Sequence, residues 1–371
     1  MPSLSVMIKP ASGQCNMACS YCFYCDEAKK REQGSFGMMS EQTLRNVIRK
    51  TMLNAEGSIT YAFQGGEPSL RGLDFFQKVI EFEQKYNHNG IRVFNAFQTN
   101  GLLLDEAWCR FFAEHGFLVG LSLDGTRETH DSFRLDLGGQ PTYDRVAQAA
   151  ALMDRFGVEY NILTVVNSEV ATHIDEIYAD YKQRGWRYQQ YIACLDPLEE
   201  ERGLKPWSLT PEVYGRFLSR LFDLWCEDWK QGQQPYIRSF ENYIAILLGY
   251  QPESCEQNGR CTAQCVVEAD GSVYPCDFYV LEPWKLGNFN TDRFDAIHGS
   301  DKIGAFVQRS YKMDPECPDC EFYKMCRGGC QRQRDLQPQG FYANYFCEAY
   351  RIFFRHSMTR MQEIAESLKG I

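Results

Sequence analysis

Hydrophobic and polar residues alternate along the first two thirds of the chain in two kinds of segment. Short runs rich in β-branched and aromatic residues predict six strands, at residues 4–10, 59–66, 92–100, 117–125, 159–167 and 187–195. Between these runs, apolar residues recur at helical spacing, as in the stretch SEQTLRNVIRKTML that begins at Ser40. Strands that alternate with helices predict an α/β fold with a parallel sheet, here an open or partial (β/α)6 barrel. The chemistry is expected at the carboxyl ends of the strands.

The pattern changes in the last third of the chain. One long helix is predicted over residues 210–232 and a last amphipathic helix over about 348–368. Regular periodicity fades after about residue 250, and nine of the sixteen cysteines fall between Cys255 and Cys347. Bound metal, rather than an apolar core, is expected to organise this segment. We therefore predict two domains, residues 1–232 and 233–371.

Composition and charge argue against some classes of binding partner. The net charge of -10 argues against a nucleic-acid or anionic-membrane surface as the main partner. No apolar run reaches the roughly 18 residues that a membrane span needs. The first residues lack the pattern of a secretory signal, so a cytoplasmic location is predicted. Disulfides are rare in that reducing compartment, and metal or cluster ligation is the better explanation for sixteen cysteines.

Three cysteines share one short loop directly after the first predicted strand. Cys15, Cys19 and Cys22 have the spacing C-x3-C-x2-C, with Cys25 outside it as a spare thiol. A zinc site usually takes four protein ligands, whereas three thiolates suit a [4Fe–4S] cluster with one open iron. The open iron can chelate the amino and carboxylate groups of a small ligand.

With Tyr21, this loop resembles the motif C-x3-C-x-aromatic-C of the radical S-adenosyl-L-methionine (SAM) superfamily. The resemblance implies that the open iron binds SAM and that an electron from the cluster cleaves it to methionine and a 5′-deoxyadenosyl radical. It also implies SAM contacts near later strand ends, at Gly66 in QGGEP, Ser122 in LSLDG, Arg134 and Leu195. Taken alone, each of these is equally a strand-end turn or a core residue.

The later cysteines form a second pattern, which a zinc ribbon could also explain. Its spacing is Cys261-x9-Gly271-x4-Cys276, then C-x2-C-x5-C-x3-C from Cys317 to Cys330, then Cys347. This pattern resembles the SPASM domain of peptide-modifying radical SAM enzymes, which carries two auxiliary [4Fe–4S] clusters. With Cys255 added, the resemblance implies two ligand sets: Cys255, Cys261, Cys276 and Cys330 for auxiliary cluster I, and Cys317, Cys320, Cys326 and Cys347 for auxiliary cluster II.

Five cysteines remain outside these sets: Cys25, Cys109, Cys194, Cys226 and Cys265. Cys109 and Cys226 lie in helical patterns and are predicted core thiols. Cys265 lies four residues after a predicted ligand, and the spacing leaves open whether it is an alternative ligand. The six histidines show no ligand spacing near a cysteine pair.

Nearly the whole chain resembles the anaerobic sulfatase-maturating enzymes, through IKPASGQCNMACSYCFY, FQGGEPSL, CLDPL and DGSVYPCDFYVL. The resemblance implies oxidation of a cysteine or serine of a sulfatase to Cα-formylglycine. It implies two partners, a peptide segment of the sulfatase and an electron donor such as flavodoxin or ferredoxin. Asp277, next to Cys276, matches the family's proton acceptor, although a solvated Asp beside a cluster is the alternative. Tyr24, Phe278 and Tyr279 are candidates for walls of the peptide groove or for packing around the cluster.

Two other functions compete with this interpretation. A radical SAM maturase of a ribosomally made peptide would share the clusters but form a thioether, a crosslink or a dehydrogenated residue. Such enzymes usually carry an N-terminal leader-binding domain, and the first predicted strand begins too early for one, at about residue 4. A non-enzymatic iron–sulfur or zinc protein would have no use for the strand-end SAM motifs. The sequence does not distinguish cysteine from serine as the substrate residue.

Overall fold

The computed structural model describes residues 3–369, which divide into two compact units. The first unit comprises Met1–Ser122, Arg134–Asn161 and Ala263–Phe306, and the second comprises Leu123–Phe133, Ile162–Thr262 and Val307–Ile371. Each unit therefore combines early and late parts of the chain. The predicted domains, 1–232 and 233–371, follow the sequence instead and stay a prediction, with their outermost two residues at each end outside the described range.

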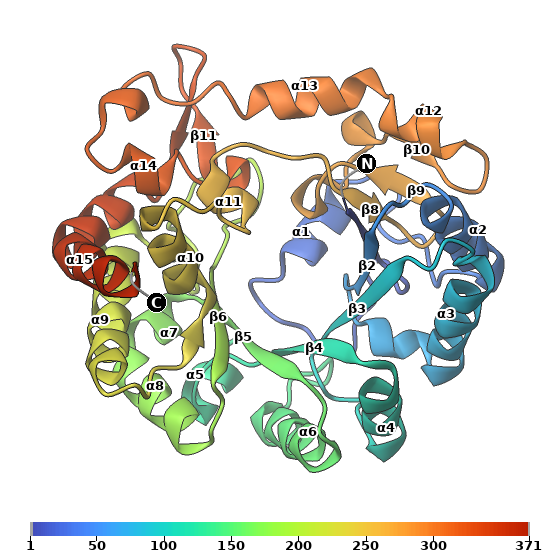
Figure 1. The fold of residues 1–371 in the computed structure, drawn as a ribbon, viewed down its shortest axis with the longest axis horizontal. Helices are drawn as coiled ribbons and strands as arrows, with labels where there is room; N and C mark the ends of the chain where they lie inside the picture. The colour runs from blue at the N-terminus through green and yellow to red at the C-terminus, as the bar shows by residue number, and fades with distance from the viewer. Residues whose placement is uncertain (1–2, 370–371) are drawn as a thin grey trace. The chain divides into compact units, whose positions relative to one another are not determined.

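The first unit is built on a sheet with the strand order β10-β9-β8-β1-β2-β3-β4 (Figure 1). Its parallel strands in chain order are β1 (Leu4–Ile8), β2 (Ser58–Phe63), β3 (Arg92–Thr99) and β4 (Phe117–Ser122). On the other side of β1, β8 (Cys265–Val267) pairs in parallel. The sheet then continues antiparallel through β9 (Ser272–Tyr274) and β10 (Gly287–Asn288).

The helices of the first unit cover this sheet. They are α1 (Phe23–Lys29), α2 (Glu41–Met52), α3 (Leu73–Tyr86), α4 (Glu106–His115), α6 (Tyr143–Phe156) and α12 (Phe294–His298), with short 3-10 turns η1 (Pro68–Arg71), η2 (Asp277–Tyr279) and η3 (Glu282–Trp284). Ser40 caps α2 by accepting a hydrogen bond from the backbone N–H of Thr43, as such sequences favour. A buried aromatic core joins α3 and α4 to the strands, with the ring centroids of Phe76 and Phe97 5.0 Å apart. This packing fixes the strand ends that carry the site.

The second unit contains β5 (Tyr160–Val166), of which the first two residues belong to the first unit, then β6 (Tyr188–Ala193) and β7 (Tyr236–Ile237), paired in parallel. Its helices are α5 (Arg127–Asp131), α7 (Ser168–Thr172), α8 (Ile174–Gln183), α9 (Pro211–Lys230), α10 (Arg238–Leu247), α11 (Cys255–Asn258), α14 (Tyr323–Cys326) and α15 (Cys347–Leu368). Helix α13 (Asp301–Arg309) spans the division. The 3-10 turns η4 (Cys317–Asp319) and η5 (Gln331–Gln333) precede a hairpin of β11 (Arg334–Leu336) and β12 (Tyr342–Asn344).

Helices α9 and α15 pack tightly against each other in the second unit (Figure 1). A Cβ added at Gly215 would lie 2.9 Å from the Cβ of Ile352, so glycine allows the close approach. Both helices are where the sequence predicts them, because long amphipathic periodicity is a strong signal. Within residues 3–369, no helix is both long and apolar enough to cross a membrane.

All six predicted strands are present, each within a few residues of its expected bounds, so the alternating α/β prediction is confirmed. The sequence did not predict the strands β7 to β12. Each of these strands has only two or three residues, too few to show a period.

Candidate functional site

The predicted cluster loop connects β1 to α1 in the first unit. Cys15, Cys19 and Cys22 lie on this loop as half-buried thiols outside any disulfide. The backbone N–H of Met17 donates to Cys15 Sγ at 3.4 Å, and Asn100 Nδ2 donates to the same sulfur at 3.6 Å. Burial raises the pKa of Cys15 to about 12, and a bound metal would be needed to hold it as the thiolate.

Cys25 is exposed on α1, one turn beyond Cys22. The hydrogen bond between Cys22 and Cys25 is the largest cause of a raised pKa at Cys22, and burial adds to it. The same hydrogen bond lowers the pKa of Cys25 to about 7. The two thiols are therefore neighbours, although only Cys22 fits the predicted ligand spacing.

Two of the predicted SAM contacts meet in the first unit. Arg134 Nη1 donates a hydrogen bond to the hydroxyl of Tyr21 at 3.0 Å. Thr142 Oγ1 donates to the backbone carbonyl of Arg134 at 2.7 Å and so fixes the segment that carries it. Ser122, a third predicted contact, is the half-buried last residue of β4. Tyr21 and Arg134, 113 residues apart in the sequence, are thus in contact, and their role as SAM contacts stays a prediction.

Gly66 follows β2, where close packing requires glycine. Its φ is +56°, and a Cβ there would lie 2.1 Å from the carbonyl oxygen of Gln14 on the cluster loop. The next residue, Glu67, is buried and accepts hydrogen bonds from the backbone of Ser69 and Asn100, at 2.9 and 2.7 Å. The GGEP turn is thus fastened to the cluster loop and to the end of β3. The sequence analysis did not foresee this structural role of Glu67.

Leu195 lies in the second unit, half-buried, two residues after β6. The neighbouring Asp196 holds the loop: its carboxylate accepts from the backbone of Gly203 at 2.9 Å and from the hydroxyl of Ser208. Arg332 Nη2 donates to the carbonyl of Asp196 at 2.7 Å. The position of Leu195 is therefore set by buried polar contacts.

Asp277, the predicted base, opens η2 and is 6% exposed. Its Oδ2 accepts hydrogen bonds from the Tyr24 hydroxyl at 2.6 Å and from Gln64 Nε2 at 2.8 Å. Its Oδ1 lies 2.9 Å from Lys9 Nζ, an ion pair that is not aligned as a hydrogen bond. Side chains from the end of β1, from α1 and from the end of β2 thus converge on this one carboxylate.

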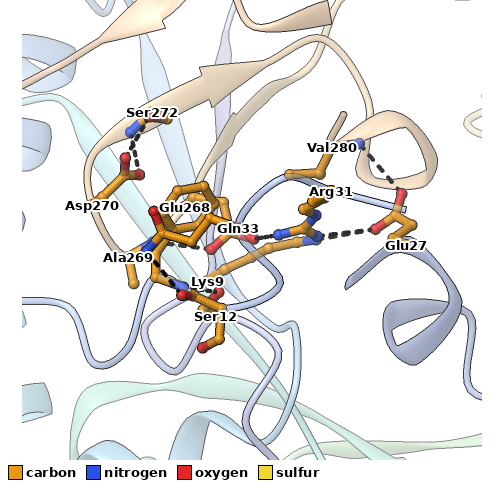
Figure 2. A network of polar contacts seen from close by, with 12 residues as sticks. Lys9, Ser12, Glu27, Arg31, Gln33, Glu268, Ala269, Asp270, Ser272 and Val280 are labelled. Atoms are coloured by element: carbon orange, nitrogen blue, oxygen red, sulfur yellow. Dashed lines mark hydrogen bonds and ion pairs between the residues drawn. The ribbon is translucent and has the colours of Figure 1, made fainter. Parts of the chain in front are cut away.

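A buried network of charges surrounds Lys9 (Figure 2). Lys9 Nζ lies 3.9 Å from Glu27 Oε2, and Arg31 Nη1 lies 2.8 Å from Glu268 Oε1. Burial would lower the pKa of Lys9, but the carboxylates of Asp277, Glu27 and Glu268 outweigh it and the net pKa is raised. Burial raises the pKa of Glu27 to about 7, against the opposing effects of Lys9 and Arg31. The ammonium group of Lys9 therefore stays charged beside the carboxylate of Asp277.

The sequence analysis assigned no role to Lys9, Gln64, Glu27, Arg31 or Glu268. A lysine directly after the apolar strand LSVMI is an available signal, because a charge at a buried strand end calls for a partner. Gln64 precedes the GGEP turn at a strand end, which is where functional side chains gather.

The structure places the SPASM-like cysteines in two units. Cys276 precedes η2 in the first unit, and the other seven predicted ligands, Cys255, Cys261, Cys317, Cys320, Cys326, Cys330 and Cys347, belong to the second. Burial raises the pKa of Cys317 to about 11 and that of Cys326 to about 12. Among residues 3–369, no three His, Cys, Asp or Glu side chains gather as ligands of one metal ion. A four-iron cluster binds each thiolate through a different iron, and the two ligand sets stay a prediction.

The four other cysteines outside the predicted ligand sets are buried. Cys109 and Cys226 are buried in α4 and α9, which confirms the prediction of core thiols. Cys194 is buried after β6. Cys265 is buried in β8 opposite Val6, and burial raises its pKa to about 12, so it packs within the sheet.

Known proteins match the chain over its whole length. The model of the radical SAM superfamily matches residues 10–181, and that of an iron–sulfur cluster-binding domain, SPASM, matches residues 255–321. A cysteine-type anaerobic sulfatase-maturating enzyme of Clostridium novyi is 44% identical over 369 residues, 99% of each chain. The chain belongs to the anaerobic sulfatase-maturating enzymes.

A serine-type member of this family, from Bacteroides thetaiotaomicron, is 31% identical over 98% of this chain and 92% of that one. The solved structure of native anSMEcpe with bound AdoMet and Cp18Cys peptide has a TM-score of 0.94 and 42% identity, and covers 99% of this chain and 100% of that chain. These matches confirm the α/β radical SAM fold with a C-terminal SPASM domain. They confirm an enzyme that uses SAM and iron–sulfur clusters.

The residues present in this sulfatase-maturating chain fit those cofactors. The first loop offers three thiols outside any disulfide, and its Cys15 sulfur already accepts two hydrogen bonds from N–H donors, which stabilise a thiolate. In the second unit, the backbone N–H of Arg332 donates in the same way to Cys330 Sγ at 3.4 Å. The donor chemistry is that of iron–sulfur ligation.

Proposed function

We propose that this chain oxidises a cysteine in a peptide segment of a sulfatase to Cα-formylglycine, with Asp277 as the base. The observation that carries this proposal is the buried carboxylate of Asp277, held by Tyr24, Gln64 and Lys9. A carboxylate can accept a proton from a substrate thiol that lies within hydrogen-bond reach. Three side chains contact this carboxylate, and one of them, Lys9, also belongs to the buried network of Glu27, Arg31 and Glu268.

The balance of atoms and electrons in the reaction requires a proton acceptor, and this is the role proposed for Asp277. When bound, SAM and the clusters would supply a 5′-deoxyadenosyl radical that takes one hydrogen atom from the substrate Cβ and an acceptor for one electron. The substrate must also release the proton of its thiol, which Asp277 takes. Loss of a hydrogen atom, an electron and a proton leaves a thioaldehyde, and water then replaces its sulfur to give formylglycine and hydrogen sulfide.

The chain's other groups prepare this acceptor. Lys9 holds the carboxylate through Oδ1, while Tyr24 and Gln64 fix its orientation through Oδ2. The rings of Phe23 and Phe278 pack edge to face, with centroids 4.8 Å apart, and close the same corner with apolar surface. Exclusion of water strengthens each of these charge interactions.

Three finer points belong to this proposal. Cysteine is the substrate residue, because the cysteine-type relative is 44% identical and the serine-type relative 31%. The peptide of the solved relative, named Cp18Cys, supports a short sulfatase segment as the partner. The electron donor is a small carrier such as flavodoxin or ferredoxin, and the compartment is the cytoplasm.

Asp277→Asn tests the base. The loaded enzyme is incubated anaerobically with SAM, a reductant and a cysteine-containing sulfatase peptide, and both 5′-deoxyadenosine and the peptide mass are followed. We expect 5′-deoxyadenosine to form while formylglycine falls by roughly a hundred- to ten-thousand-fold. Asp295→Asn is the matched control, because this carboxylate is exposed on the same unit and its ion pair is with Arg293.

Two outcomes would contradict the proposal. Equal yields of formylglycine and 5′-deoxyadenosine at the parent rate in Asp277→Asn, with iron content unchanged, would exclude Asp277 as the base. A parent product with the mass of a thioether, a crosslink or a simple dehydrogenation would indicate instead a maturase of ribosomally made peptides.

A further inference from the structure

Arg334, at the start of β11, is buried and is 5% exposed. All four of its hydrogen bonds go to backbone carbonyls. Nε donates to Gly328 at 2.9 Å and Nη1 to Ser310 at 2.7 Å. Nη2 donates to Gly259 at 2.9 Å and to Gly329 at 2.6 Å. The guanidinium group is thus fixed by three separate stretches of the second unit.

Each of these stretches carries predicted cluster ligands. Gly259 caps α11, the short helix that begins at Cys255. Gly328 and Gly329 lie between Cys326 and Cys330. The Ser310 hydroxyl accepts a hydrogen bond from the backbone N–H of Cys261 at 3.1 Å. Arg334 therefore joins segments whose cysteines are assigned to both auxiliary clusters.

Glycine makes this convergence of carbonyls possible. Gly259 has φ +66°, and a Cβ there would lie 1.9 Å from the carbonyl oxygen of Arg327. Gly329 also has φ +66°, and its Cβ would lie 2.3 Å from Asn344 Nδ2. Any side chain at either position would push the backbone away from the guanidinium group.

The charge of Arg334 lacks a carboxylate partner within the described part of the chain. The adjacent carboxylate, Asp335, pairs with Arg202 at 2.8 Å instead. Burial lowers the pKa of Arg334, and the cysteines Cys330, Cys261, Cys317 and Cys326 oppose this effect. A buried cation without a counter-charge is strongly unfavourable, and the segments that Arg334 joins carry the predicted ligands of anionic clusters.

We propose that Arg334 is a positioning residue whose fixed positive charge raises the reduction potential of the auxiliary clusters and so favours their acceptance of the substrate electron. A cluster bound by four thiolates is anionic and gains one further negative charge on reduction, which a nearby cation stabilises. Net charge and hydrogen bonding set the potentials of such clusters. The proposal rests on the cluster assignment within the proposed function, and not on the identity of the peptide.

Arg334→Gln in the full-length, iron-loaded enzyme tests the charge. The measurement is an anaerobic redox titration followed by electron paramagnetic resonance, and the Cys15→Ala/Cys19→Ala/Cys22→Ala background identifies the auxiliary signals. At the parent midpoint, we expect the ratio of reduced to oxidised auxiliary cluster to fall about tenfold, which is about 59 mV for one electron. Arg334→Lys keeps the charge and should restore most of the ratio.

Arg220→Gln is the matched control in the same unit. Arg220 pairs with Asp175 on the surface, where solvent and salt screen its charge, so its loss should leave the midpoint unchanged. A parent-like midpoint in Arg334→Gln with full iron content overturns the proposal, as does an equal shift in Arg334→Gln and Arg334→Lys.

Iron content decides the remaining outcomes. If Arg334→Gln loses auxiliary iron and Arg334→Lys retains it, the charge holds the cluster in place instead of setting its potential, and the proposal is overturned. If both variants lose iron, the carbonyl contacts are what matters and the charge proposal is wrong. A parent enzyme without auxiliary iron contradicts the cluster assignment itself, and is distinguished from failure of the proposed function by the peptide product.

Discussion

Both units bury positive charge, but they compensate it in different ways. In the first unit, Lys9 and Arg31 contact carboxylates of the same chain, Asp277, Glu27 and Glu268. In the second unit, Arg334 donates its hydrogen bonds within residues 3–369 to backbone carbonyl oxygens, on segments that carry predicted cluster cysteines. The first arrangement is complete as a protein structure, whereas the second needs a bound anion to balance its charge.

The two regions also differ in what holds them. Lys9 follows β1, Glu27 lies in α1 and Glu268 follows β8, so paired strands and a helix position the first network (Figure 2). Arg334 is held by turns around short helices of four residues, α11 and α14. Helices of that length have little stability of their own. We therefore expect the proton-accepting corner to form without clusters and the Arg334 region to depend on them.

The largest effect should come from removing the ligands of the first loop. Cys15→Ala/Cys19→Ala/Cys22→Ala should abolish SAM cleavage, because no cluster remains there to supply the electron. Iron should fall from about twelve to about eight per chain, since the two auxiliary clusters stay bound. Iron analysis and a 5′-deoxyadenosine assay check this. Cys25→Ala is the control and should keep both values, while SAM cleavage at the parent rate in the triple variant would show that the loop is misassigned.

Removing the cation from the first network should have the next largest effect. Lys9→Met leaves Asp277 and Glu27 buried with less compensation, and loss of one partner of such a pair costs about 3–5 kcal/mol of unfolding free energy. Urea denaturation of the loaded enzyme measures this. Lys9→Met/Asp277→Asn should recover part of the loss, because the unpaired charge is gone.

Lys78→Met provides the comparison in the same unit, because Lys78 pairs with Glu81 on the surface. Its urea midpoint should stay close to that of the parent, since solvent already stabilises both groups. A change for Lys9→Met no larger than for Lys78→Met would show that the buried network does not depend on its ammonium group.

The same contrast explains what the sequence could predict. Long periodic segments such as α9 and α15 are visible because many positions repeat one pattern. Tyr21 and Arg134 came from motifs of the family, and the structure brings them together. The cysteine spacings indicated clusters because iron ligation requires particular residue types.

The charged network could not be predicted from pattern. Arg31 and Glu268 are 237 positions apart, and no period links a residue after α1 to one after β8. Strand β8 has only three residues, too few for alternation to reveal it, yet its pairing with β1 is what places Glu268 beside Arg31. The contacts of Arg334 could not be predicted either, because every residue type has a backbone carbonyl and the sequence therefore does not mark the partners.

Glu83 in the first unit is the opposite case to Arg334: it is a buried carboxylate for which the described residues provide no cationic partner. Its Oε2 accepts from Asn95 at 3.1 Å, while Oε1 has no hydrogen-bond partner within residues 3–369. Burial raises its pKa from 4.5 to about 7. Between these values the folded state binds more protons than the unfolded state, so stability is lost as the pH rises through this window.

Glu83→Gln should remove that loss, which amounts to about 3 kcal/mol at most. Urea denaturation of the parent and the variant from pH 5 to pH 8 measures the difference. The unfolding free energy of the parent should fall relative to that of Glu83→Gln as the pH rises. A difference that is constant across this range would show that Glu83 keeps an ordinary pKa in the folded enzyme.

The smallest effect should come from Arg202, which lies in the same unit as Arg334 but has a carboxylate partner. Arg202 Nε lies 2.8 Å from both carboxylate oxygens of Asp335, whose side chain is 46% exposed. A pair that reaches solvent gains little net energy, so a double-mutant cycle of Arg202→Gln and Asp335→Asn should give a coupling of about 1 kcal/mol. Urea denaturation of the four loaded proteins measures it. A coupling free energy as large as that between Lys9 and Asp277 would contradict this comparison. It would show that a solvent-exposed carboxylate in the second unit can compensate an arginine as well as a buried one does, and the argument that Arg334 needs a cluster would be weakened.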